Sequence, residues 1–213
     1  MPGKQTSAAT SAAGQEPRSL AALNRLIMSS APFVEGSRNA VLGEGPLRPD
    51  VAFVGEQPGD QEDHEGRPFV GPAGKLLDRA LEDAGMERSA VYITNAVKHF
   101  KFLPRGKRRI HQSPTVGEIK HYRWWLRREL DFVAPRLVVA LGASAVHALE
   151  GKRLAISRSR GPHRFAELQH PGYITVHPSY LLRIPSEGDR KREYRAFLRD
   201  LQRARKLAAD SVH

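Results

Sequence analysis

Four short apolar runs alternate with helical patterns along this chain, and this alternation constrains the fold more than any other feature. The runs occupy residues 51–54, 91–94, 137–141 and 173–176. Each run has the length of a buried strand, and helical patterns separate the runs. Strands that alternate with helices are typical of a parallel sheet covered on both faces. We therefore predict a single α/β domain.

Helix signals lie between and beyond these runs. The patterns predict helices over residues 72–84, from about residue 115, and over about 189–208, and a helical face formed by Leu20, Leu23 and Ile27. Pro72 suits the first turn of its helix and Gly85 suits its end. Thr115 and Glu118 have the spacing of a capping box.

The first 17 residues differ from the rest. Residues 1–17 are rich in Ser, Ala, Gly and Thr and have no apolar periodicity, so we expect a disordered tail there. Residues 18–213 form the expected single domain, because no internal repeat or second domain is visible. A monomer is the default expectation.

Charge and cysteine content narrow the classes of function. The chain has 34 Lys+Arg and 23 Asp+Glu, a formal net charge of +11, and an estimated pI of about 10.3. This excess favours a polyanionic partner, with nucleic acid ahead of a lipid surface. Cysteine is absent, which excludes disulfides, thiol nucleophiles and all-cysteine iron–sulfur clusters. With no signal peptide and no apolar run near the ~18 residues of a membrane span, we expect a soluble, cytoplasmic protein.

Polar side chains occur within two residues of the end of three of the four apolar runs. These are Glu56, Asn95 and His177. Because the carboxyl ends of parallel strands meet at one edge of a sheet, we expect the three to converge there. Gly55 and Gly59 indicate a tight turn that brings backbone N–H groups near a ligand, although an acidic surface loop is the alternative.

Three further residues are candidates with ordinary alternatives. Phe69 lies between glycines and either fills the core or stacks on a planar base. The Asn95 amide either bonds the neighbouring loop or pairs with one edge of a pyrimidine. His111 is either a surface histidine or, next to cations that favour its neutral form, a nucleophile.

The segment from Lys98 to His111, KHFKFLPRGKRRIH, is the main basic region. It contains six Lys/Arg, two His and two Phe and no acidic residue. A solvated loop is the plain interpretation, but basic residues interleaved with aromatic ones fit contact with single-stranded nucleic acid. A phosphate-binding loop is excluded, because GPAGK at residues 71–75 does not have its pattern.

Five segments in order now indicate a family. They are GEQPGDQED, GRPFVGPAGKLLD, YITNAVKHF, KRRIH and HPSYLL. Together they resemble the uracil-DNA glycosylase superfamily, in the branch close to the iron–sulfur (family 4) enzymes, over residues 43–183. KRRIH resembles the signature of the UdgX type, which forms a covalent bond to uracil-containing DNA. The resemblance implies a three-layer α/β/α sandwich with a short, central, mainly parallel sheet.

The resemblance also implies a role for each matching residue. The uracil would be bound by Gly55, Gln57, Phe69 and Asn95. His177 would donate to the uracil oxygen that becomes negative as the glycosidic bond breaks. Glu56, with Asp60 nearby, would balance the cationic sugar and orient the attacking group, which is His111 in the crosslinking branch. Contacts to DNA would come from Lys98, Lys107, Arg108, Arg109, Ser179 and Arg183.

One departure from the family concerns its cofactor. Related enzymes hold a four-iron cluster with cysteines, and the matching positions here are Met28, Ala31, His99 and Tyr122. One histidine cannot hold such a cluster, so we predict no metal and no cofactor, with packing by Met28, Tyr122, Trp124 and Trp125 in its place.

The expected function is therefore recognition of uracil in DNA, preferentially single-stranded, followed by base excision and a covalent adduct through His111. The first alternative is a multiple-turnover glycosylase in which His111 only contacts phosphate. The second is a uracil-DNA binding protein without catalysis.

Overall fold

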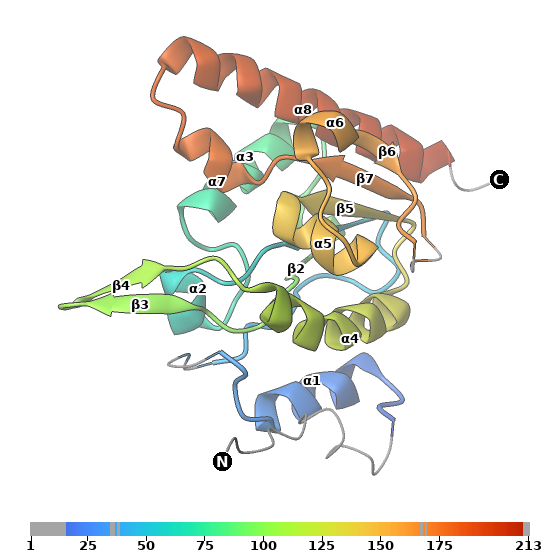
Figure 1. Cartoon of the computed structure of the whole chain (residues 1–213). Coiled ribbons are helices and arrows are strands. Elements are labelled where there is room, and N and C mark those ends of the chain that lie inside the picture. The colour runs from blue at the N-terminus through green and yellow to red at the C-terminus, as the bar shows by residue number, and fades with distance from the viewer. Residues whose placement is uncertain (1–15, 35–36, 38, 167, 169, 211–213) are drawn as a thin grey trace.

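The computed structural model describes residues 16–34, 37, 39–166, 168 and 170–210, and it has three layers (Figure 1). The middle layer is a five-stranded sheet of order β2-β1-β5-β7-β6. Its strands are β1 (Val51–Gly55), β2 (Tyr92–Asn95), β5 (Leu137–Leu141), β6 (Gly161–His163) and β7 (Gly172–Thr175). Only the edge strand β6 is antiparallel to its neighbour among these five. This confirms the mainly parallel sheet.

Helices cover both faces of the sheet. One layer contains α1 (Leu20–Ser29), α4 (Val116–Val133) and α5 (Ala143–Glu150), and the other contains α3 (Pro72–Asp83), α7 (Pro178–Leu182) and α8 (Glu187–Asp210). Side chains of β1 alternate between the two cores: Ala52 and Val54 pack with the first layer, and Val51 and Phe53 with the second. All five residues of β1 are buried, as a central strand covered on both faces requires.

The predicted helix signals are confirmed. Leu23 and Ile27 are the buried residues of α1. The Thr115 hydroxyl accepts the Glu118 N–H at the start of α4, and the Glu118 carboxylate accepts the Thr115 N–H, so the capping box forms. Gly85 follows α3 with φ of 72°, a left-handed conformation that glycine adopts without strain.

The largest difference from expectation is a β-hairpin in the basic segment. Strands β3 (Phe102–Arg105) and β4 (Arg108–His111) pair antiparallel, with Phe102 opposite His111. Figure 1 shows this hairpin extending away from the three layers. Sequence analysis predicted only a loop, because the segment lacks the alternation of apolar and polar residues that marks a half-buried strand. The short helices α2 (Asp60–Glu65) and α6 (Ile156–Ser159) and the 3₁₀ turn η2 (Arg88–Ala90) also lacked a clear signal.

The expected tail lies mostly outside the described residues, which begin at Glu16. Glu16 accepts from Arg128 of α4 at 3.3 Å, and Pro17 is buried. In the described part of the chain, no helix combines the length and the apolar character needed to cross a membrane.

The strand order creates a crevice at a defined place. From β1 the chain crosses to β2 on one side, and it later returns to β5 on the other side. In open parallel sheets, ligands bind at the carboxyl ends of the strands where the order reverses in this way. The fold therefore predicts a ligand site at the segments that follow β1 and β5.

A core substitution in the α8 layer tests the packing. Leu201 is fully buried, so Leu201→Ala should lower the free energy of unfolding by about 2–5 kcal/mol, measured by urea denaturation. Leu103 on the hairpin is 59% exposed, and Leu103→Ala should change it by less than about 0.5 kcal/mol. Equal effects of the two substitutions would contradict this assignment of the core.

Candidate functional site

A cleft of about 1050 Å³ opens at the carboxyl ends of the parallel strands. Each of the four parallel strands places a polar side chain at it: Glu56 after β1, Asn95 at the end of β2, Ser144 after β5 and His177 after β7. Phe69 and His111 also line it. The structure thus brings together Glu56, Asn95 and His177, as the sequence predicted.

Phe69 is held against the floor of this cleft. A Cβ atom on Gly55 would lie 2.5 Å from Phe69 Cζ and 2.4 Å from Asn95 Oδ1, so only glycine fits beneath these two side chains. The Phe69 ring is 5.6 Å from the His177 ring and tilted by 33°. Although Phe69 is a buried residue, one face of the cleft is formed by it, so the core and stacking interpretations are compatible.

The Phe69 backbone is strained and is stabilised by its neighbours. Its φ is +55°, a region that costs a bulky residue about 1–3 kcal/mol. Arg88 donates to the carbonyl oxygens of Pro68 at 2.7 Å and Phe69 at 3.3 Å and forms an ion pair with Asp78. A Cβ on Gly74 would lie 1.8 Å from the Phe69 carbonyl oxygen, so α3 approaches this turn closely. Sequence analysis gave Arg88 no role, and no local pattern signals one.

Asn95 carries an unmet hydrogen-bond requirement. The residue is 2% exposed, and its Oδ1 atom is buried without a hydrogen-bond partner among the described residues. Leaving a buried acceptor unsatisfied costs about 1–3 kcal/mol, and a ligand N–H group would remove that cost. The arrangement therefore suits a ligand with a donor at this point.

His177 is a neutral hydrogen-bond donor. Burial lowers its pKa to about 4, with smaller effects from the charges of Arg183 and His111. Its Nδ1 atom accepts the Ser179 N–H at 3.1 Å, so the single proton of the neutral ring is on Nε2. A neutral Nε2–H group in a cleft can stabilise negative charge that develops on a ligand oxygen.

Glu56 lies between two other cleft residues. Its Oε2 atom accepts from Ser144 Oγ at 2.5 Å, and its Oε1 atom is 3.4 Å from His111 Nε2. The Ser144 contact spans the crevice between β1 and β5 and fixes one carboxylate oxygen, which leaves the other beside the imidazole. Ser144 was not predicted as a site residue. Its position just after the apolar run at residues 137–141 could have indicated that it lies at the same edge of the sheet.

The Gln57 amide holds the base of the hairpin. Its Oε1 accepts the Lys101 N–H at 3.3 Å, and its Nε2 lies within 3.2 Å of the Lys101 and Gln112 carbonyl oxygens and 3.0 Å from His111 Nε2. The two amide hydrogens thus face two carbonyl oxygens and one ring nitrogen of His111. Because this side chain is occupied by the hairpin, contact of Gln57 with a base stays a prediction.

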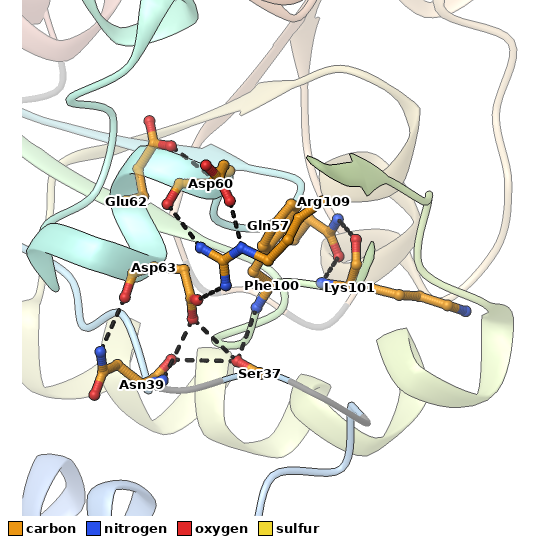
Figure 2. A network of polar contacts seen from close by, with 10 residues as sticks. Ser37, Asn39, Gln57, Asp60, Glu62, Asp63, Phe100, Lys101 and Arg109 are labelled. Carbon is orange, nitrogen blue, oxygen red and sulfur yellow. Dashed lines mark hydrogen bonds and ion pairs between the residues drawn. The ribbon is translucent and has the colours of Figure 1, made fainter. Parts of the chain in front are cut away.

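Arg109 fixes the hairpin on the protein (Figure 2). It forms ion pairs of 2.5 Å with both Asp60 and Asp63, and its Cζ atom is 5.3 Å and 5.1 Å from the ring centres of Phe100 and Phe102. The Arg109 side chain is 14% exposed. The guanidinium is thus bound by carboxylates, and the expected contact of Arg109 with DNA stays a prediction. The role of Asp60 in catalysis stays a prediction.

Lys98 is likewise bound by a carboxylate. The residue is 3% exposed, and its Nζ atom donates to Glu129 at 2.5 Å, to Thr94 Oγ1 at 2.6 Å and to the Asn95 carbonyl at 2.8 Å. The structure therefore does not place Lys98 at the surface, and its predicted contact with DNA stays a prediction. Lys98 anchors the backbone of Asn95.

The other predicted DNA contacts lie at the surface. Lys107 and Arg108 are exposed at the tip of the hairpin, where Gly106 has φ of 58°. Ser179 and Arg183 line the cleft, and Arg183 Nη1 donates to Ser179 Oγ at 3.2 Å. Their binding to DNA stays a prediction.

The positions that match cluster ligands do not fit a metal cluster. His99 Nδ1 is 2.6 Å from the Tyr122 hydroxyl, which accepts the Phe33 N–H at 3.2 Å. Within the described ranges, no group of three or more His, Cys, Asp or Glu residues has the geometry of a metal site. Tyr122 is buried, as expected of a packing residue, but Met28 is 66% exposed and Trp124 is 43% exposed, which corrects their expected part in packing.

A charge-removing substitution tests the buried ion pair. Lys98→Met should lower the free energy of unfolding by about 3–5 kcal/mol, because Glu129 would remain buried and charged without a partner. The double variant Lys98→Met with Glu129→Gln should recover part of this loss in urea denaturation. If the single substitution has no effect, Lys98 is not buried as described.

Two histidines with lowered pKa values, His99 and His177, predict a pH dependence of stability. Burial lowers the pKa of His99 to about 4, as it does for His177. Between about pH 6.5 and 4 the unfolded chain binds protons at these positions and the folded chain does not, so stability should fall with the pH. Urea denaturation at pH 6.5 and 5 measures the slope, which His99→Asn should reduce. An unchanged slope in His99→Asn would contradict this account of His99.

The sequence is similar to known proteins over most of its length. The family described as "Uracil DNA glycosylase superfamily" matches residues 42–202. The type-4 uracil-DNA glycosylase of Thermotoga maritima is 38% identical over 179 residues, which cover 83% of this chain and 87% of the relative. That of Pyrobaculum aerophilum is 38% identical over 162 residues, covering 73% and 79%. That of Sulfurisphaera tokodaii is 36% identical over 156 residues, covering 70% and 68%.

Proposed function

The chain belongs to the uracil-DNA glycosylase superfamily, and from this premise we propose that it excises uracil from DNA and is captured covalently by the abasic sugar through His111. One observation carries the second half of the proposal: His111 Nε2 lies 3.4 Å from the Glu56 carboxylate at the cleft. An imidazole in this position competes with water for the sugar carbon.

Recognition of the base depends on three side chains. Uracil would stack on Phe69, and its N3–H group would donate to the unpartnered Asn95 Oδ1 atom. The uracil O2 atom, on the carbon between N1 and N3, would accept from His177 Nε2. Asn95 is anchored by Lys98 through its backbone, so this pairing edge is held in place before the base arrives.

Bond cleavage leaves charges that the site can stabilise. As the bond between the sugar C1′ and uracil N1 breaks, its electron pair goes to uracil, and the sugar becomes an oxocarbenium ion. The neutral His177 donor stabilises the uracil anion, a kind of interaction worth about 3–4 kcal/mol of barrier. The Glu56 carboxylate stabilises the cationic sugar, and uracil then takes a proton from solvent.

Capture requires a lone pair on His111 Nε2. The Gln57 amide lies 3.0 Å from this atom and donates to it when the imidazole proton is on Nδ1. The hydrogen bond from Gln57 would then break, the freed lone pair would form the bond to C1′, and the exposed imidazole would lose its Nδ1 proton to solvent. Arg109 is a positioning residue in this scheme, because it lies two residues before His111 on β4 and fixes that strand.

Two finer expectations belong to this proposal. Single-stranded DNA is the preferred substrate, since extrusion of the base then costs little unpairing energy and the exposed hairpin tip carries Lys107 and Arg108. Neither step needs an iron–sulfur cluster, and the residues at His99 and Tyr122 do not fit one.

The proposal is tested on a denaturing gel with a labelled single-stranded oligonucleotide that contains one uracil. The protein should give a slow band that survives heating in detergent. The His111→Gly variant should give no such band, because the nucleophile is gone, and should leave abasic DNA that alkali cleaves. His64→Gly, which removes an exposed histidine of α2, should behave like the unchanged protein.

Each alternative has its own outcome in this experiment. Alkali cleavage without a slow band in the unchanged protein would indicate a multiple-turnover glycosylase. No change in either lane would indicate a binding protein without catalysis. A slow band that survives His111→Gly would show that another residue is the nucleophile.

A further inference from the structure

The cleft does not end at α7 but continues into a second groove of about 640 Å³. Four residues line both spaces: Arg160, Tyr180, Arg183 and Glu193. The far wall of the groove comes from α8 and includes Arg192 and Arg199. A polymer with one unit in the cleft can therefore extend into this groove without leaving the surface.

Half of the groove's arginine charges are neutralised by carboxylates. Arg160 donates to Asp200 at 2.6 Å and to Glu193 at 3.2 Å, and Arg192 donates to Asp189 at 2.6 Å. Arg183 and Arg199 have no carboxylate partner in the described part of the chain. Arg160 binds two carboxylates, so the four arginines and the three carboxylates leave a net charge of +1, and the arginines without an ion pair in the described residues are Arg183 at the end of α7 and Arg199 on α8.

The rest of the lining is aromatic or apolar. Tyr180 is 42% exposed, and Ile184, Pro185 and Ala196 complete the surface. The carboxylates of Asp189 and Glu193 also line the groove but are held in ion pairs with Arg192 and Arg160. Unpaired arginines beside aromatic and apolar surface are complementary to a nucleic-acid strand, in which anionic phosphates alternate with planar bases. An acidic protein segment would also match the charge, but the direct continuity with a cleft suited to a nucleotide favours the strand.

We propose that this groove binds the phosphodiester next to the nucleotide held in the cleft, with Arg199 as a new cationic contact beside Arg183, whose contact with DNA the family resemblance already implies. The inference rests on the proposed function, because it supplies the path of the DNA strand beyond the excised base. Arg199 is the informative residue, since it is exposed, lies outside the cleft and has no structural partner among the described contacts.

The test uses single-stranded oligonucleotides that carry 2′-fluoro-deoxyuridine, whose glycosidic bond resists cleavage. Each oligonucleotide has one neutral methylphosphonate in place of one phosphate near the uracil. At one linkage, this replacement should weaken binding to the unchanged protein about tenfold, as expected for one charge-assisted contact, measured by fluorescence anisotropy. Arg199→Gln should lose about the same factor with ordinary DNA and nothing more with that methylphosphonate.

A matched control separates this contact from general charge. Arg25 is exposed on α1, in the layer on the opposite face of the sheet, and Arg25→Gln removes the same charge. It should retain both the affinity and the tenfold effect of the methylphosphonate. Circular dichroism melts of the two variants should match that of the unchanged protein.

Failure of this inference can be distinguished from failure of the proposed function. The groove does not hold the strand if Arg199→Gln binds DNA with unchanged affinity. The same conclusion follows if the affinity lost through Arg199→Gln adds to the affinity lost through the methylphosphonate at every linkage. In both cases uracil excision and the adduct would persist. An acidic protein as the true occupant would give this same unchanged DNA binding. If the unchanged protein neither excises uracil nor prefers it over thymine, the proposed function itself fails.

Discussion

The ion pairs of Arg109 with Asp60 and Asp63 hold His111 at the cleft of this protein. The hairpin that carries His111 extends from the three layers, and its own two strands bury little apolar surface. Two carboxylates from α2, together with the faces of Phe100 and Phe102, hold one arginine of β4 and thereby the whole strand. Because side chains two residues apart lie on the same side of a strand, fixing Arg109 also directs His111 toward Glu56.

Burial prepares the remaining groups for their proposed roles. His177 stays neutral because the ring is enclosed, and Ser179 selects the tautomer with the proton on Nε2. Lys98 and Glu129 form an ion pair beneath β2 that anchors the Asn95 backbone, while Asn95 Oδ1 has no partner of its own. A rigid site with one unmet acceptor is preorganised for a ligand, since binding supplies the missing hydrogen bond without reordering the protein.

At the positions that match the cluster ligands of related enzymes, the structure has a network of uncharged hydrogen-bonded groups. His99, Tyr122 and the Phe33 backbone form a chain of hydrogen bonds between the segment after β2, α4 and the segment after α1. Phe33 also stacks on His121 of α4, with ring centres 4.0 Å apart. By packing and hydrogen bonds, these contacts connect the same three parts of the chain in which the positions matching cluster ligands lie.

The sequence by itself determined the fold class and the convergence of Glu56, Asn95 and His177, because apolar runs mark buried strands and parallel strands present their carboxyl ends at one edge. It also determined the helix boundaries at Thr115 and Gly85, which depend on local capping. Only the tertiary structure decided the fates of the basic residues. Lys98 and Arg109 look alike in a run of cations, yet one is buried against Glu129 and the other is bound by Asp60 and Asp63. Their partners are 31 to 49 residues away in the chain, and pairing over such distances is set by packing that no local pattern encodes.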